Sequence, residues 1–263
     1  NKVKKSEKHI DLLQKRLNLV NKISISDAMA LLNLTESSVR RIFARMEKEG
    51  LAMRVHGGLV KMASTPKTTD DYNYTIVETE NISQKTKIAM AVANLIADKS
   101  SVYLDSGSTL YRVSLALASV MQHNPNPDLK VFTNSLKNLE VLQGLCAIRI
   151  SGGDYRIARQ DLCGFIAENS ISMLNFDTCV IGSDGIDLES GLSTTDFETA
   201  SLCMCALKHS KTKILAVDSS KFNKTALVTY ANLADFSIIV TDSGIDEKSL
   251  NLLKQHNIEV ILV

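Results

Sequence analysis

From about residue 83 onward, the sequence alternates between helical segments and short apolar runs rich in β-branched residues. Helical patterns over 83–97, 109–119, 136–143, 197–210 and 246–257 separate runs at 101–105, 129–134, 147–151, 178–184, 213–218, 236–242 and 258–263. Short runs of continuous apolar residues are typical of parallel strands, because helices cover both faces of a parallel sheet. The pattern therefore predicts an α/β domain over 83–263, built on an open, mostly parallel sheet.

The first 62 residues follow a different pattern, which predicts three helices and a hairpin. Ser26 is the expected N-cap of a short second helix, and Thr35 caps a third helix that extends to about Glu49. Two short segments, 51–55 and 59–62, would form the strands of a wing. We therefore predict a winged helix-turn-helix domain over 1–62 and a polar linker over 63–82.

Charge is divided unevenly between these two parts. Residues 1–62 hold 13 Lys and Arg against 6 Asp and Glu, or +7, whereas the remaining residues hold 17 against 23, or −6, which together give the net +1. A small basic module joined to a larger acidic one is expected where only the first part meets a polyanion.

Cysteine usage and hydropathy narrow the class of protein further. The five cysteines are an odd number without a dense framework, which suits a reducing cytosol, and Cys203 and Cys205 have the wrong spacing for a metal-binding pair. No apolar run reaches the roughly 18–20 residues that a membrane span needs. We predict a cytoplasmic protein with no metal, no cofactor and no membrane segment.

The third predicted helix presents arginines on the side opposite its apolar face. A helix fits the DNA major groove, and the planar fork of an arginine can pair with guanine or hold a phosphate. A solvated helix face would explain the arginines alone, but their combination with the wing and the charge favours DNA contact. The predicted DNA-binding residues are Thr35, Ser37, Ser38, Arg40, Arg41, Arg45, Arg54, His56 and Gly57.

These residues also carry a resemblance. The segment "ISISDAMALLNLTESSVRRIFARMEKEGLAMRVHGGLV" resembles the DNA-binding signature of the DeoR family of bacterial transcriptional regulators, in its paired arginines, its "EGL" step and its "RVHGG" wing. One position departs from the family, because Ile42 stands where an aspartate commonly follows the paired arginines.

Polar loops follow several of the predicted strands in the acidic part. The carboxyl ends of parallel strands meet at one edge of a sheet, where ligands bind, and the amino end of a helix favours an anion. Short polar turns also cap helices without binding anything. The predicted effector-binding residues are Asp105, Ser106, Gly107, Ser108, Thr109, Thr133, Asn134, Ser135, Gly153, Arg156, Asp184, Gly185 and Lys221.

The same loops resemble the DeoR-family effector domain, whose fold is similar to ribose-5-phosphate isomerase and glucosamine-6-phosphate deaminase. The resemblance implies a phosphorylated sugar as ligand, with Lys221 and Arg156 offsetting the phosphate charge. A second departure occurs in the helix after "STTD", where Thr199 and Cys203 replace the glutamate and lysine usual in the family.

The hypothesis is a transcriptional repressor of carbohydrate metabolism genes that binds operator DNA as a dimer or tetramer and responds to a sugar phosphate. One alternative is an isomerase or deaminase, since "DGID" at 184–187 resembles an aspartate-bearing isomerase motif, although Leu188 and "ESGLST" replace the residues that usually follow. The other alternative is a DNA-binding protein whose acidic domain only oligomerises.

Overall fold

The computed structural model describes residues 2–20, 22–55, 57–60, 74–256 and 258–263. The chain divides into two compact units, Asn1–Thr69 and Asp70–Val263. The predicted linker over 63–82 lies largely outside the described residues. Its described part contains a short helix, α4 (Tyr74–Val77), which the sequence pattern did not indicate.

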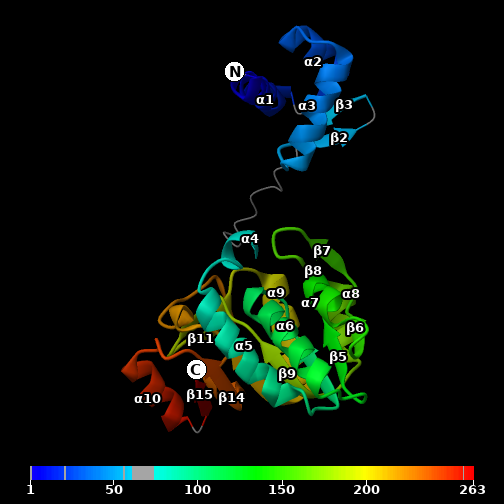
Figure 1. The fold of residues 1–263 in the computed structure, drawn as a ribbon. Helices are drawn as coiled ribbons and strands as arrows, with labels where there is room; N and C mark the ends of the chain where they lie inside the picture. The colour runs from blue at the N-terminus through cyan, green and yellow to red at the C-terminus, as the bar shows by residue number, and fades with distance from the viewer. Residues whose placement is uncertain (1, 21, 56, 61–73, 257) are drawn as a thin grey trace. The chain divides into compact units, whose positions relative to one another are not determined.

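The first unit is a winged helix-turn-helix domain, as predicted (Figure 1). Its elements are α1 (Lys2–Val20), β1 (Lys22–Ser24), α2 (Ile25–Leu32), α3 (Glu36–Lys48), β2 (Met53–Val55) and β3 (Gly58–Val60). The strands pair antiparallel in the order β1-β3-β2, so that β1, which was not predicted, completes the wing. The α3 residues Val39 and Phe43 are buried in the core of this unit, as their helical spacing predicts.

The N-cap of α2 is Ser24, and the prediction of Ser26 was wrong. The Ser24 hydroxyl accepts a hydrogen bond from the backbone N–H of Asp27, while the Asp27 carboxylate accepts one from the Ser24 backbone N–H. This reciprocal pair is a capping box, with Asp in place of the usual Glu or Gln at its third helical position. The helix consequently starts one residue after the β1 strand ends.

The second unit is an α/β domain with a seven-stranded parallel sheet, which confirms the predicted fold class. Its sheet strands are β4 (Ser101–Leu104), β5 (Lys130–Thr133), β6 (Ala147–Ile150), β9 (Phe176–Ile181), β12 (Ser210–Ala216), β14 (Ile238–Thr241) and β15 (Glu259–Leu262). Its longer helices are α5 (Ile82–Ile96), α6 (Ser108–His123), α7 (Leu136–Leu142), α8 (Phe165–Ser172), α9 (Phe197–Lys208) and α10 (Glu247–Gln255).

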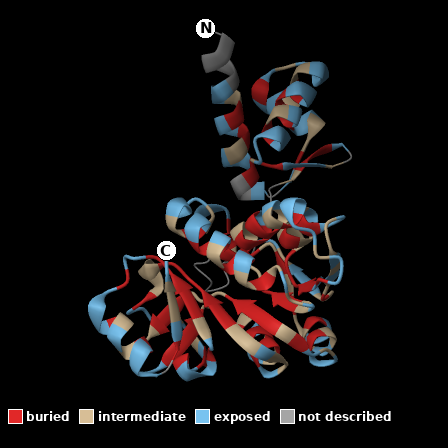
Figure 2. Ribbon diagram, turned by 60° about the horizontal axis from the view of Figure 1, so that its bottom comes forward, coloured by how far each residue is buried: buried red, intermediate tan, exposed pale blue. Residues whose placement is uncertain are grey.

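Two cores lie on opposite faces of this sheet. Val102 and Leu104 of β4 pack with α5 and α6, whereas Tyr103 between them packs with α8 and α9, as the two-residue period of a strand requires. The strands β4, β5, β9 and β14 are buried along most of their length, whereas the edge strands β6 and β15 are only partly buried or exposed (Figure 2). This two-sided burial explains why the strands appear in the sequence as continuous apolar runs.

The strand order β15-β14-β12-β9-β4-β5-β6 contains one reversal of direction. The chain proceeds outward from β4 to β5 and β6, then returns to β9 on the other side of β4 and proceeds outward through β12 to β15. The reversal leaves a crevice between the carboxyl ends of β4 and β9, which is where open α/β sheets bind ligands.

Short strands outside the main sheet close over this end of the domain. They are β10 (Gly185–Asp187), β11 (Gly191–Thr194) and β13 (Val228–Ala231), which form an antiparallel sheet, and the hairpin of β7 (Asp154–Arg156) and β8 (Asp161–Cys163). The sequence pattern did not predict these strands, because three or four residues are too few to establish a period.

Candidate functional site

The outer side of α3 is exposed and carries the predicted DNA-binding arginines. The side chain of Arg40 forms an ion pair with Glu36, at 2.6 Å between Nη2 and Oε1, and Arg45 forms one with Glu49 at 2.6 Å. Arg41 donates only a long hydrogen bond, 3.4 Å, to the Ser37 carbonyl. Within the described part of the chain, Arg41 has no carboxylate partner, so its fork remains able to bind another group.

Ile42, the departure from the family pattern, is part of the core of the first unit and is only 9% exposed. It therefore cannot orient an arginine by a polar contact. Glu36, one turn before Arg40, supplies the carboxylate that holds Arg40. Exposed pairs at this spacing contribute about 0.3–0.5 kcal/mol, enough to bias a side chain without fixing it.

The amino end of α3 and the wing flank these arginines. Thr35 stands at the N-cap position but its hydroxyl accepts no capping bond among the described residues; it donates to the Ser38 hydroxyl at 3.1 Å and lies 3.2 Å from that of Ser37. Arg54 on β2 is exposed and lies 3.6 Å from the carboxylate of Glu47. The wing turn contains Gly57, whose φ of +80° is a conformation that glycine adopts readily. His56 lies outside the described residues.

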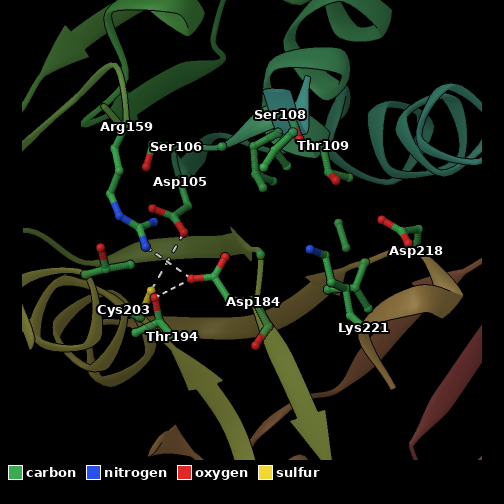
Figure 3. Close-up of a pocket in the computed structure, with 18 of the residues that line it drawn as sticks. Asp105, Ser106, Ser108, Thr109, Arg159, Asp184, Thr194, Cys203, Asp218 and Lys221 are labelled. Carbon is green, nitrogen blue, oxygen red and sulfur yellow. Dashed lines mark hydrogen bonds and ion pairs between the residues drawn. The ribbon is translucent and has the colours of Figure 1, made fainter. Parts of the chain in front are cut away.

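In the second unit, a cavity of about 620 Å³, measured with its open mouth, lies at the crevice between β4 and β9. The loop after β4 contributes Asp105 through Thr109, and the loop after β9 contributes Gly182 through Asp184 (Figure 3). The α6 helix begins at Ser108, so its first backbone N–H groups lie along the cavity wall. The structure therefore brings two of the predicted loops together.

Two aspartates on the inner wall of the cavity differ in their burial and in their hydrogen-bond partners. Asp105 is only 5% exposed, and its burial raises its pKa to about 7. The Cys203 thiol donates to Asp105 Oδ2 at 3.7 Å, and burial raises the pKa of this thiol as well. Asp184 instead accepts hydrogen bonds from Arg159 at 3.2 Å and from the Thr194 hydroxyl at 2.8 Å.

The opposite wall of the cavity carries two lysines and a third aspartate. Lys221 follows β12 and is half-buried, and within the described residues its ammonium has neither a hydrogen bond nor an ion pair (Figure 3). Lys85 of α5 is only 1% exposed, and burial lowers its pKa, an effect that nearby Asp218 partly offsets. Asp218 Oδ2 is buried with no hydrogen-bond partner among the described residues. The Lys221 ammonium and Asp218 Oδ2 are therefore available to a ligand, whereas the Lys85 ammonium already donates to the Val77 carbonyl at 2.7 Å.

Arg156, the arginine predicted for the ligand, is not part of the cavity wall. Its guanidinium forms ion pairs with Asp161 at 2.8 Å and Asp196 at 2.7 Å, and these carboxylates help to raise its pKa against the opposing effect of burial. Arg159 lines the cavity instead and is held by Asp184 and Asp196. The two arginines lie three residues apart in one hairpin, and the sequence alone could not show which of them faces the cavity.

Five further predicted residues lie behind the cavity wall rather than on it. Thr133, Asn134 and Ser135 bond to neighbouring backbone and side-chain groups, and the Ser135 hydroxyl caps α7. Gly153 and Gly185 are required by close packing, since a Cβ atom would lie 2.3 Å from the Cys163 carbonyl oxygen and 2.7 Å from that of Lys224 respectively.

Sequence reasoning missed several residues that line the cavity. Among them are Lys85, Arg159, Thr194 and Tyr230. One signal was available for Lys85, because it shares the buried face of α5 with Ile88 and Val92, where a lysine is unusual. Thr199 and Cys203, the two positions at which the resemblance implies a glutamate and a lysine, both line the cavity.

Comparison with known proteins bears on both units. Residues 10–65 match the family described as the DeoR-like helix-turn-helix domain, and residues 80–243 match the DeoR C-terminal sensor domain. The chain belongs to the DeoR family of transcriptional regulators. It is 30% identical to the putative aga operon transcriptional repressor of Escherichia coli O157:H7, over 98% of this chain and 94% of that protein.

Other relatives give the same assignment. The transcriptional repressor AccR of Agrobacterium fabrum is 30% identical over 80% of each chain. Among solved structures, the ribose 5-phosphate isomerase of Plasmodium falciparum is similar at 18% identity and a TM-score of 0.40, covering 54% of this chain and 53% of that one, which is too distant to support an argument about ligand or activity.

The DeoR-family assignment decides between regulator and enzyme. The relatives are named as transcriptional regulators and repressors, so the prediction of a regulator rather than an isomerase is supported. No helix in the described part of the chain combines the length and hydropathy needed to cross a bilayer.

Proposed function

We propose that this DeoR-family regulator is a cytoplasmic repressor of carbohydrate metabolism genes, released from its operator when a phosphorylated sugar binds the cavity of the second unit. In this proposal α3 reads the DNA, and two or more copies of the chain bind together. The names of the relatives, among them a putative aga operon repressor, support a role in gene regulation.

One observation carries the proposed ligand class. The cavity at the β4–β9 crevice combines the amino end of α6 with Lys221, which has no ion pair among the residues that the structure describes, and with the buried carboxyl groups of Asp105 and Asp218. The helix end and the lysine suit a phosphate, because both favour negative charge. The carboxylates suit hydroxyl groups, which donate hydrogen bonds to them. A sugar phosphate presents both kinds of group at opposite ends.

The first test is a thermal-shift screen of the full chain against ribose 5-phosphate, fructose 6-phosphate, glucosamine 6-phosphate, galactosamine 6-phosphate and their unphosphorylated sugars. A ligand at one hundred times its Kd stabilises the folded state by about 2.7 kcal/mol, which shifts the unfolding midpoint measurably. We expect at least one phosphorylated compound to stabilise the chain and its free sugar not to do so.

Substitutions then assign the site. Lys221→Ala should lower the affinity of the chain for a stabilising compound by about 10- to 100-fold, since charged hydrogen bonds contribute about 1.5–3 kcal/mol. Lys224→Ala is the matched control, because Lys224 is exposed, lies in the same loop and does not line the cavity. Equal affinity in both variants would rule out the proposed role of Lys221.

The second test measures DNA binding by the same protein. The full chain should retard a fragment from upstream of its own gene, and the stabilising compound should weaken this complex. A chain that binds DNA but is stabilised by no phosphorylated sugar would instead have a second unit that serves assembly alone. Chemical conversion of a stabilising compound by the protein would instead support the alternative of an isomerase or deaminase.

A further inference from the structure

Two neighbouring helices of the second unit expose large apolar side chains. On α8 and at its C-cap these are Phe165, Ile166 and Met173, which are 77%, 62% and 77% exposed. On α9 they are Phe197 and Met204, which are 73% and 55% exposed. We call these five side chains the α8–α9 face. The two helices contact each other, since the Cys205 thiol of α9 donates to the Glu168 carbonyl oxygen of α8 at 3.6 Å.

The inner sides of both helices are already used by the core. Ala167 and Ile171 of α8 and Ala200 and Ala206 of α9 are buried together in one cluster against the sheet. A helix at the surface of a monomer normally has a polar outer side. These helices have apolar side chains on the outer side as well, with Ile166 and Met173, like Phe197 and Met204, seven residues apart and therefore on one stripe.

The size of the α8–α9 face is appropriate for a protein interface. A fully exposed aromatic side chain presents about 150–250 Å², so Phe165 and Phe197 at 77% and 73% exposure leave roughly 220–380 Å² accessible between them, and Ile166, Met173 and Met204 add to this area. The largest apolar patch of a typical monomer covers about 300–600 Å². A standard interface covers about 800 Å² on each partner, so the five side chains would form its apolar centre and neighbouring polar residues the remainder.

Charges on α9 favour a second copy of this chain as the partner. Glu198 stands in the first turn of the helix and Lys208 in the last, both exposed, and neither forms an ion pair among the described residues. If two α9 helices pack antiparallel about a two-fold axis, Glu198 of each copy approaches Lys208 of the other. A two-fold interface requires this self-complementarity, because the same patch contributes both sides.

We propose that the α8–α9 face is the contact between two copies of this chain, with the α9 helices antiparallel across a two-fold axis. The inference rests on the proposed function in one respect, since a regulator that reads two half-sites requires paired heads. The α9 helix then has the interface on one side and the cavity residues Thr199 and Cys203 on another.

Sedimentation velocity of the full chain over a range of concentrations tests the apolar contact. We expect the wild type to be at least a dimer. Met204→Glu and Phe165→Glu should each raise the dissociation constant of this self-association at least 100-fold. The matched control is Met90→Glu, the same change at an exposed position of α5, 44% exposed, which should leave the constant unchanged. Circular dichroism and the unfolding midpoint verify that each variant is folded.

Charge reversal tests the antiparallel arrangement. Glu198→Lys and Lys208→Glu should each weaken association several-fold, and the double variant should restore it. If the two apolar variants associate like the wild type, or the double variant does not recover, the proposed interface is wrong. A wild type that stays monomeric at all concentrations would also overturn it. DNA retardation by the wild type is measured in parallel, so that loss of the interface is distinguished from failure of the regulator proposal.

Discussion

The exposed side of α3, which we call the reading surface, and the cavity of the second unit both carry charged side chains. The two regions differ in how the fold positions these side chains. On α3, arginines and their glutamate partners are exposed and lie four residues apart on one helix. In the cavity, Asp105, Asp184 and Lys221 come from three different strand ends and are partly or wholly buried. Local spacing determines the first site, and tertiary packing determines the second.

This difference has energetic consequences. Exposed pairs are screened by solvent and contribute little, so the α3 arginines can exchange their glutamates for phosphates or bases at low cost. Buried groups pay for desolvation, and leaving one unpaired costs more than any exposed pair contributes. The cavity is therefore expected to respond to pH and ligand, and the reading surface to salt and DNA sequence.

The largest expected effect tests whether the two units fold independently of each other. Phe43 of α3 is 2% exposed in the core of the first unit, so Phe43→Ala should destabilise that unit by about 3–5 kcal/mol and abolish DNA binding. Stabilisation of the second unit by its ligand should persist, as two separate transitions in thermal unfolding would show. Leu31→Ala, at a position 40% exposed in the same unit, is the control. Loss of ligand binding in Phe43→Ala would show that the units are coupled in folding.

Burial of Asp105 predicts an effect of pH on the second unit. Its pKa is raised from 3.8 to about 7 in the folded state, so the protonated carboxyl stabilises the fold. That contribution is complete below pH 3.8 and is lost as the pH rises to about 7, at up to about 1.4 kcal/mol per pH unit.

Denaturant unfolding between pH 4 and 7 measures this slope. Asp105→Asn should reduce it, because the amide does not titrate. Asp128→Asn, at an exposed position, should leave it unchanged. The pH effect that arises from Asp196 has the opposite sign. Arg159 and Arg156 lower the pKa of Asp196 against the effect of burial, so the stability that this group contributes is lost only as the pH falls. An unaltered slope in Asp105→Asn would mean that Asp105 stays ionised.

The same contrast explains which features the sequence could predict. The helices follow from the period of their apolar residues and the longer strands from their continuous apolar runs, and α3 follows in detail because its two faces are set by spacing alone. The position of the loop after β4 at the crevice was predictable because strand ends converge there. Lys85 had a local signal in its place on the buried face of α5, whereas Arg159 had none, because whether an arginine of this hairpin turns into the cavity depends on partners far away in sequence, such as Asp184.

A smaller effect concerns the role of Arg41. Arg41→Ala should weaken binding to the specific operator by about 1–3 kcal/mol if the fork reads a base. An equal loss on specific and unrelated duplexes, with a shallower salt dependence, would instead identify a phosphate contact. Lys15→Ala, on α1 and paired with Asp11, is the control for loss of positive charge alone. Titration of both duplexes at two salt concentrations separates these outcomes.

The smallest expected effect concerns the N-cap of α2, where the prediction of Ser26 was wrong. Ser24→Ala removes the hydroxyl that accepts from the Asp27 backbone N–H at 3.1 Å, so it should destabilise the first unit by about 1 kcal/mol. Ser26→Ala removes only a hydroxyl contact with Ser24, at 2.8 Å, and should cost less than half as much. Both are measured by thermal unfolding of the full chain. If the two variants lose the same unfolding free energy, the capping box does not determine where α2 begins. Local sequence spacing would then determine less of the first unit than the α3 helix indicates.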